Sequence, residues 1–217
     1  MSYLLTAYLI NQIINERTTV HMLNYSEACE RNKQSILEKL STYLTCRKTI
    51  LEVGSGSGQH ALFLSSHHQH LTWQPSDQER YLDALHINIE QYASHGVLLP
   101  IELNVNHTWP NILYDGIYTA NTLHIMGWEE VENFFKGAGS CIEKNGYLFV
   151  YGPFRYNNTY TSASNAQFDQ WLKTRDSNSG IRQFEAVNAL AHDQGLSLIE
   201  DCLMPANNQL LIWQRDT

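Results

Sequence analysis

Residues 51–60 have the residue types and spacing of a nucleoside-binding loop. Their sequence is LEVGSGSGQH, with a glutamate two positions before a GxGxG run. Glycines at alternate positions permit positive φ and close backbone approach to a ligand, and a helix beginning just after them offers free N–H groups. A dinucleotide fingerprint has the spacing GxGxxG instead, and a glutamate would repel its pyrophosphate. The carboxylate would attract the cationic amino group and sulfonium of S-adenosyl-L-methionine. The sequence therefore predicts a site for that cofactor at Glu52, Gly54, Ser55, Gly56 and Gly58.

Three polar residues at the ends of later apolar segments extend this predicted site. Asp77 follows the second such segment, where its carboxylate can accept both ribose hydroxyls. Asn104 follows the third, where its amide can recognise the adenine edge, although a strand-end turn explains it as well. Asn121 follows the fourth and is expected to floor the methionine side of the pocket, with a purely structural role as the alternative.

The candidates for the chemistry itself are fewer. His124 comes after the fourth apolar segment, and its unperturbed pKa near 6.5 suits a general base. A hydrogen-bonded histidine at a helix start is the alternative interpretation. Arg31 with Asn32 can grip the cofactor carboxylate or an acidic substrate, or form an ordinary exposed pair.

After the fifth apolar segment, an aromatic stretch with a single cation can line a substrate pocket, or be a surface loop; it comprises Phe154, Arg155 and Tyr156. The histidines at 67, 68 and 70 have no carboxylate or thiol partner nearby, so no metal site is predicted.

Composition narrows the class of partner. The chain of 217 residues is 43% hydrophobic and has net charge −8, with basic residues scattered along it. This balance predicts a folded protein with a small-molecule partner rather than nucleic acid, and it specifies no particular oligomeric state. No run reaches the roughly 18 to 20 apolar residues of a membrane span. Four isolated cysteines indicate free thiols, so a cytoplasmic location is expected.

Alternating helical and strand-like patterns must position these residues. Helices are expected at 26–43, 59–66, 78–93, 128–142, 164–173 and 182–194, and strands at 49–53, 71–73, 97–103, 115–120, 146–151, 196–203 and 209–213. Strand–helix units in succession imply a parallel sheet covered on both faces, and the short last connection requires an antiparallel hairpin. The predicted fold is α/β: a Rossmann-like, seven-stranded, mostly parallel sheet with an antiparallel C-terminal hairpin, as in class I methyltransferases.

Several strings carry a closer resemblance: ACERNK at 28–33, GQH at 58–60, WQPSD at 73–77, GPF at 152–154, SNAQFD at 164–169, GIR at 180–182 and MPANN at 204–208. From Tyr25 to the C-terminus the chain resembles a small family of methyltransferase-like proteins of undefined substrate, found in bacteria and animals. The resemblance implies a class I fold that binds S-adenosylmethionine, and it brings no known acceptor. Asn104 departs from the aspartate that the family carries there.

The resemblance divides the chain into an extension and one domain. Residues 1–21 precede the similar region, and they are either an added amphipathic helix or the product of a wrongly chosen upstream start codon, the second being favoured. Residues 22–217 are predicted to form a single methyltransferase-like domain.

The leading functional hypothesis is methyl transfer from S-adenosylmethionine to a small-molecule acceptor. The alternative is a catalytically inactive S-adenosylmethionine-binding regulatory or interaction module, because no unambiguous base is present. NAD-dependent oxidoreduction is a weaker third hypothesis, since the glycine spacing and Glu52 disagree with pyrophosphate binding.

Overall fold

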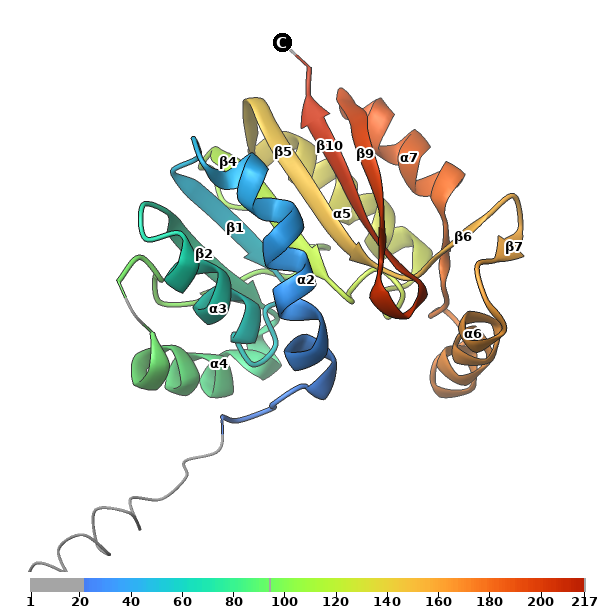
Figure 1. The fold of residues 1–217 in the computed structure, drawn as a ribbon, viewed down its shortest axis with the longest axis horizontal. Helices are drawn as coiled ribbons and strands as arrows, with labels where there is room; N and C mark the ends of the chain where they lie inside the picture. The colour runs from blue at the N-terminus through green and yellow to red at the C-terminus, as the bar shows by residue number, and fades with distance from the viewer. Residues whose placement is uncertain (1–21, 94, 217) are drawn as a thin grey trace, which may run out of the picture.

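A seven-stranded sheet forms the centre of the computed structural model, which describes residues 22–93 and 95–216 (Figure 1). Its strand order is β3-β2-β1-β4-β5-β10-β9. The bounds are β1 (Thr49–Val53), β2 (Thr72–Asp77), β3 (Ile101–Glu102), β4 (Tyr114–Ala120), β5 (Ile142–Gly152), β9 (Leu196–Met204) and β10 (Asn208–Arg215). Strands β3 to β5 in this order pair in parallel, whereas β10 is antiparallel to both β5 and β9. The predicted Rossmann-like class I fold is confirmed.

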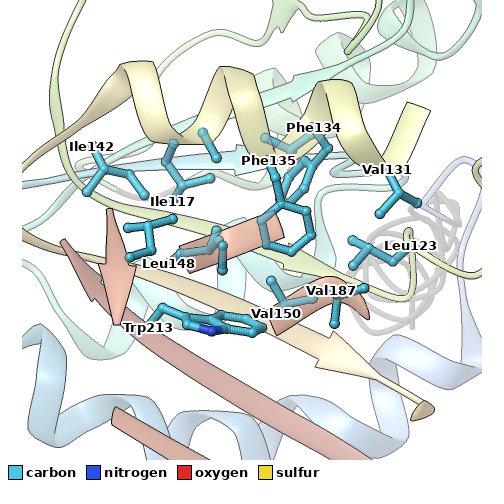
Figure 2. Packing of buried hydrophobic residues seen from close by; sticks show 14 of the residues in the cluster. Ile117, Leu123, Val131, Phe134, Phe135, Ile142, Leu148, Val150, Val187 and Trp213 are labelled. Carbon is cyan, nitrogen blue, oxygen red and sulfur yellow. The ribbon is translucent and has the colours of Figure 1, made fainter. Parts of the chain in front are cut away.

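Helices cover both faces of this sheet, since alternate side chains of a strand point to opposite sides. In β1, Ile50 packs in a buried cluster with residues of α2 (Glu27–Leu44), α3 (Gln59–His67) and α4 (Glu79–Tyr92). The next residue, Leu51, packs in a second cluster with α5 (Trp128–Cys141) and α7 (Phe184–Asp193). Figure 2 shows this second cluster, in which Phe134 and Phe135 of α5 lie over Leu148 and Trp213 of the sheet.

A second, smaller sheet was not predicted. Its order is β7-β6-β8, formed by β6 (Phe154–Tyr156), β7 (Thr159–Tyr160) and β8 (Arg182–Gln183). It lies with α6 (Ala163–Arg175) to one side of the large sheet (Figure 1). The helix expected from residue 182 begins at Phe184 instead, because residues 182 and 183 pair with β6.

Several strand bounds also differ from expectation: β2 continues to Asp77, and β5 begins at Ile142. The strand predicted at 97–103 is reduced to β3, and Val97 makes only an isolated bridge with Trp73. The tight connection between β9 and β10 is a 3-10 turn, η1 (Pro205–Asn207), in which Ala206 and Asn207 have positive φ. The predicted extension at residues 1–21 lies outside the described residues. Within 22–93 and 95–216, none of the helices combines the length and the apolar character needed to cross a bilayer.

Candidate cofactor and acceptor site

Four cavities lie in a row at the carboxyl ends of the central strands. The sheet changes direction of winding between β1 and β4, and ligands of open α/β sheets bind at such a switch point. We name the cavities by one lining feature each: the Leu103 cavity (about 240 Å³), the glycine-loop cavity (about 230 Å³), the Arg31 cavity (about 390 Å³) and the His124 cavity (about 420 Å³). Gly54 and Asp77 line the first two, and Asn121 lines the last three.

The glycine loop after β1 leaves room for a ligand. Gly54 has φ of 74°, and a Cβ there would lie 2.6 Å from Cγ2 of Thr122. Gly56 has φ of 58°, and a Cβ there would meet no atom within 4 Å. Gly56 lines the glycine-loop cavity, so this open space is where a ligand can approach the backbone. Ser55 and Gly58 complete the predicted loop: Ser55 lines the same cavity, and Gly58 is the N-cap of α3.

Asp77 lies opposite this loop at the end of β2. Its side chain is 7% exposed, and its Oδ2 accepts a 2.7 Å hydrogen bond from the Gly56 N–H. Oδ1 accepts a hydrogen bond from the N–H of Gln78 at 2.8 Å. Burial raises the pKa of the carboxyl, although the two N–H groups oppose that shift. The carboxylate thus ties the loop to β2 and still has lone pairs for a ligand, since each oxygen can accept more than one bond.

Glu52 lies behind the loop and lines none of the four cavities. Its side chain is 2% exposed, and its Oε2 accepts a 3.0 Å hydrogen bond from Nε1 of Trp73. Burial raises the pKa of Glu52 to about 7, and the Trp73 bond offsets part of this rise. The structure therefore does not bring Glu52 into direct reach of the cavities, because the strand alternation turns it toward Trp73 and Tyr118.

This burial predicts a pH-dependent effect of Glu52→Gln. The pKa of Glu52 is raised in the folded protein, so the folded state holds the proton between pH 4.5 and about 7, and stability falls as pH rises through that window. A glutamine accepts the Trp73 N–H without ionising. The variant's free energy of unfolding, relative to wild type, should rise by up to about 3 kcal/mol between about pH 4.5 and about pH 8. Urea unfolding at both pH values measures it.

The matched control is Glu79→Gln, which removes an exposed carboxylate of α4. The free energy of unfolding of this variant should stay close to that of wild type at both pH values. A Glu52→Gln difference that is the same at both would contradict ionisation of Glu52 in this pH range.

The first described helix, α2, brings Arg31 and Asn32 to the site. Arg31 is exposed, lines the Arg31 cavity and makes no ion pair with any described residue. Asn32 is buried beside His60, with its Oδ1 2.7 Å from Nε2 of that histidine. Burial lowers the pKa of His60 to about 4, so the ring is neutral and its Nε2–H donates to the amide oxygen.

The two predicted asparagines differ in placement. Asn121 has φ of 59°, a conformation that asparagine adopts more readily than most residues, and its N–H donates to the Tyr151 carbonyl at 2.9 Å. Asn104 lines none of the four cavities, although its neighbours Leu103 and Val105 do. Its Oδ1 accepts the N–H of Asn106 at 3.0 Å, the turn geometry that was the alternative interpretation. Adenine recognition by Asn104 stays a prediction.

His124 lines the cavity named after it and is 7% exposed. Burial, assisted by the positive charge of Arg182, lowers the pKa of its imidazole to about 4. Its ring centroid lies 5.3 Å from that of Phe168 in an edge-on arrangement. The Arg182 side chain donates hydrogen bonds to the carbonyls of Leu123 and Met126, which holds the His124 segment against the small sheet.

The structure does not bring the predicted substrate residues of β6 to these cavities. Phe154 is 1% exposed inside the α5–α7 core cluster. Tyr156 donates a 2.7 Å hydrogen bond to Oδ2 of Asp201 and stacks on Phe184. Arg155 pairs with Tyr160 and Gln183 in the small sheet, and like its neighbours it lines none of the four cavities. Pairing with β7 and β8 gives the segment a strand's alternation, which corrects the prediction of a pocket-lining loop.

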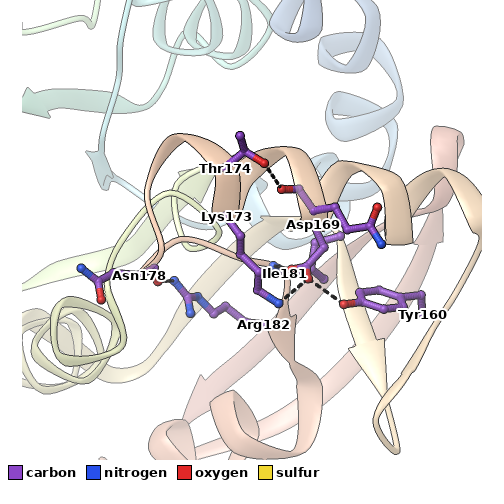
Figure 3. A network of polar contacts seen from close by, with 8 residues as sticks. Tyr160, Asp169, Lys173, Thr174, Asn178, Ile181 and Arg182 are labelled. Carbon is purple, nitrogen blue, oxygen red and sulfur yellow. Dashed lines mark hydrogen bonds and ion pairs between the residues drawn. The ribbon is translucent and has the colours of Figure 1, made fainter.

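The His124 end of the row is instead walled by α6, whose Ser164, Asn165 and Phe168 line the His124 cavity. The string SNAQFD in the sequence contained these residues, but its resemblance assigned them no role. Asp169 anchors the helix (Figure 3): its carboxylate accepts hydrogen bonds from the Ile181 N–H at 2.6 Å, the Tyr160 hydroxyl at 2.6 Å and the Lys173 ammonium at 2.5 Å.

Comparison with solved structures shows the same fold in methyltransferases. An O-methyltransferase family protein from Burkholderia thailandensis superposes with a TM-score of 0.77 and 19% identity, over 88% of this chain and 58% of that chain. Human N-acetylserotonin methyltransferase in complex with SAM superposes with a TM-score of 0.66 and 13% identity, over 92% of this chain and 60% of that chain. An O-methyltransferase family 2 protein from Planctomyces limnophilus in complex with apigenin superposes with a TM-score of 0.68 and 13% identity, over 84% of this chain and 61% of that chain.

The chain thus spans less than two thirds of the length of these three proteins, and at such identities the likeness shows the fold alone. Residues 23–215 match the family described as "Protein of unknown function (DUF938)". The chain belongs to this family, and it has the class I methyltransferase fold.

Proposed function

We propose that the protein binds S-adenosylmethionine along the carboxyl ends of β2, β1 and β4 and transfers its methyl group to a small molecule in the His124 cavity. The observation that carries this proposal is the Asp77 carboxylate opposite the open space at Gly56, where two cavities at the switch point share Gly54 and Asp77 in their lining. The methyltransferases with this fold, one of them in complex with SAM, add support.

The residues of the row match the parts of this cofactor. The Leu103 cavity, with apolar walls from Val53, Leu103 and Val105, suits the adenine. Asp77 accepts the ribose hydroxyls, and the glycine loop admits the methionine part close to the backbone. Arg31 at the far side can pair with the cofactor carboxylate, with Asn32 fixing the local packing of α2. Glu52 lines none of the four cavities and has no direct contact with the cofactor in this proposal.

The cofactor supplies an electrophilic methyl group on a positively charged sulfur. The protein must hold the nucleophilic atom of the acceptor within about 3 to 3.5 Å of that carbon and keep water away. His124 is buried and neutral at physiological pH, so an unprotonated ring nitrogen can accept a hydrogen bond from an acceptor hydroxyl or amine, and its lowered pKa makes it a weaker base than an ordinary imidazole. Asn121, which lines three of the cavities, lies at the junction between cofactor and acceptor.

Isothermal titration with S-adenosylmethionine and S-adenosylhomocysteine tests the binding step. We expect saturable heat with both ligands, and no heat at high micromolar ligand would refute the proposal. Incubation with methyl-labelled cofactor and a metabolite extract then separates an enzyme from an inactive binding module: a labelled metabolite supports transfer, whereas binding without any labelled product supports the module.

A further inference from the structure

We infer that the His124 cavity recognises an uncharged acceptor through a hydrogen-bond donor group, a hydroxyl or N–H, that binds Oδ1 of Asn165. This inference rests on the proposed function, because it names the class of molecule that the acceptor side of the row takes. Its support does not depend on the cofactor. It comes from the orientation of the Asn165 amide and from a cavity lining that has no charged residues.

The Asn165 amide has a defined orientation. Its Nδ2 donates hydrogen bonds to Oγ1 of Thr161 at 2.8 Å and to the carbonyl of Asn207 at 2.9 Å. The carbonyl of Asn207 can only accept a hydrogen bond, so the group that faces it must be the NH₂ of the Asn165 amide. The oxygen and nitrogen of this amide are therefore assigned by chemistry, and Oδ1 is the atom left over.

That oxygen is an unused acceptor in the wall of a cavity. Asn165 is 6% exposed and lines the His124 cavity, and its Oδ1 has no hydrogen-bond partner among the described residues. It is also absent from the buried polar atoms that are sealed off without a partner. Because Oδ1 is not sealed off, water can reach it, and a ligand that brings a donor replaces that water and gains the modest net free energy of one hydrogen bond.

The rest of the cavity indicates an uncharged ligand with a flat apolar part. Its lining consists of alanine, proline, serine, asparagine, phenylalanine and histidine side chains, with no carboxylate, lysine or arginine. His124 adds no charge, because its burial keeps the imidazole neutral. Phe168 and Pro153 both line the cavity, and the ring of Trp171 stacks on that of Phe168 with 5.7 Å between the ring centroids. Moving a charged group into such a cavity costs more than moving a neutral one.

The test uses three simple probes on the protein saturated with S-adenosylhomocysteine: phenol, its methyl ether anisole, and benzylammonium. Phenol has a neutral ring and one donor, anisole lacks the donor, and benzylammonium carries a charge. Titration followed by ligand-observed NMR gives the three affinities. We expect phenol to bind at least about tenfold more tightly than either of the others.

Two variants then locate the effect. Asn165→Ala should reduce the phenol-to-anisole ratio to within about twofold, while Gln167→Ala, at an exposed α6 residue that lines none of the four cavities, should keep it. Equal binding of phenol and anisole by the wild type would overturn the inference. So would tighter binding of benzylammonium, no binding of any probe at millimolar concentration, or an unchanged ratio in a folded Asn165→Ala protein.

The ratio of phenol affinity to anisole affinity in the wild-type protein tests the inference even if Asn165→Ala fails to fold. Saturation with S-adenosylhomocysteine is measured first in the same samples. Absence of that binding refutes the proposed function, whereas cofactor binding without a preference for phenol refutes only the inference about the acceptor.

Discussion

Replacing Asp77 by alanine is expected to weaken the binding of S-adenosylmethionine by about tenfold to a hundredfold. The variant loses the carboxylate that lies opposite the glycine loop and that, in our proposal, accepts the ribose hydroxyls. Hydrogen bonds to an ionised group are about twice as strong as neutral ones, and this carboxylate is buried enough to be shielded from water. Isothermal titration of wild type and variant measures the ratio of affinities.

Asp83→Ala is the matched control for this variant. It makes the same chemical change at an exposed position of α4 that lines none of the four cavities, so affinity should stay within about twofold. Thermal unfolding of both variants checks that the loop, which Asp77 also ties through the Gly56 N–H, remains folded. A folded Asp77→Ala protein with wild-type affinity would show that the cofactor lies elsewhere.

Replacing Asp169 by alanine should lower the free energy of unfolding by about 2 to 4 kcal/mol. Asp169 is 1% exposed, and three elements donate hydrogen bonds to it: β7 through Tyr160, α6 through Lys173, and the chain just before β8 through the Ile181 N–H. The alanine leaves the buried Ile181 N–H without an acceptor. Urea unfolding measures the loss, and binding of S-adenosylmethionine should change little because the anchor lies outside the glycine loop.

The pH dependence of this loss has a defined sign. Burial alone would raise the pKa of Asp169, but the hydrogen bonds from Lys173 and Tyr160 and from the Ile181 N–H hold it below its usual value. A carboxyl with a depressed pKa stabilises the fold above its unfolded pKa, and that contribution disappears as pH falls through the folded value. The difference in the free energy of unfolding between wild type and Asp169→Ala should therefore become smaller at acidic pH. Asp169→Asn, which keeps an acceptor for the Ile181 N–H, should lose less stability than the alanine variant at neutral pH.

The sequence alone determined the large sheet and the glycine-loop end of the candidate site. Strand β1 was predicted at its observed bounds, and each predicted helix is present within a few residues. Burial of one helix face leaves a local period of apolar residues, and burial of both faces of a strand leaves a short continuous apolar run. Gly54, Gly56 and Asp77 were predicted from spacing, and they line one cavity. Loops at the carboxyl ends of neighbouring parallel strands meet wherever the fold is known, so those residues needed no further information.

Only the tertiary structure decided the His124 end of the candidate site. The prediction from Phe154, Arg155 and Tyr156 assumed a loop, but pairing with residues 182 and 183, far along the chain, makes the segment a strand and buries Phe154. Asn165 lines a cavity where α6 meets the β9–β10 turn, with its amide donating to the carbonyl of Asn207. Such pairings between distant segments leave no period in the sequence. The walls of the His124 cavity are therefore set by long-range packing, whereas the glycine loop and Asp77 follow from local order along the chain.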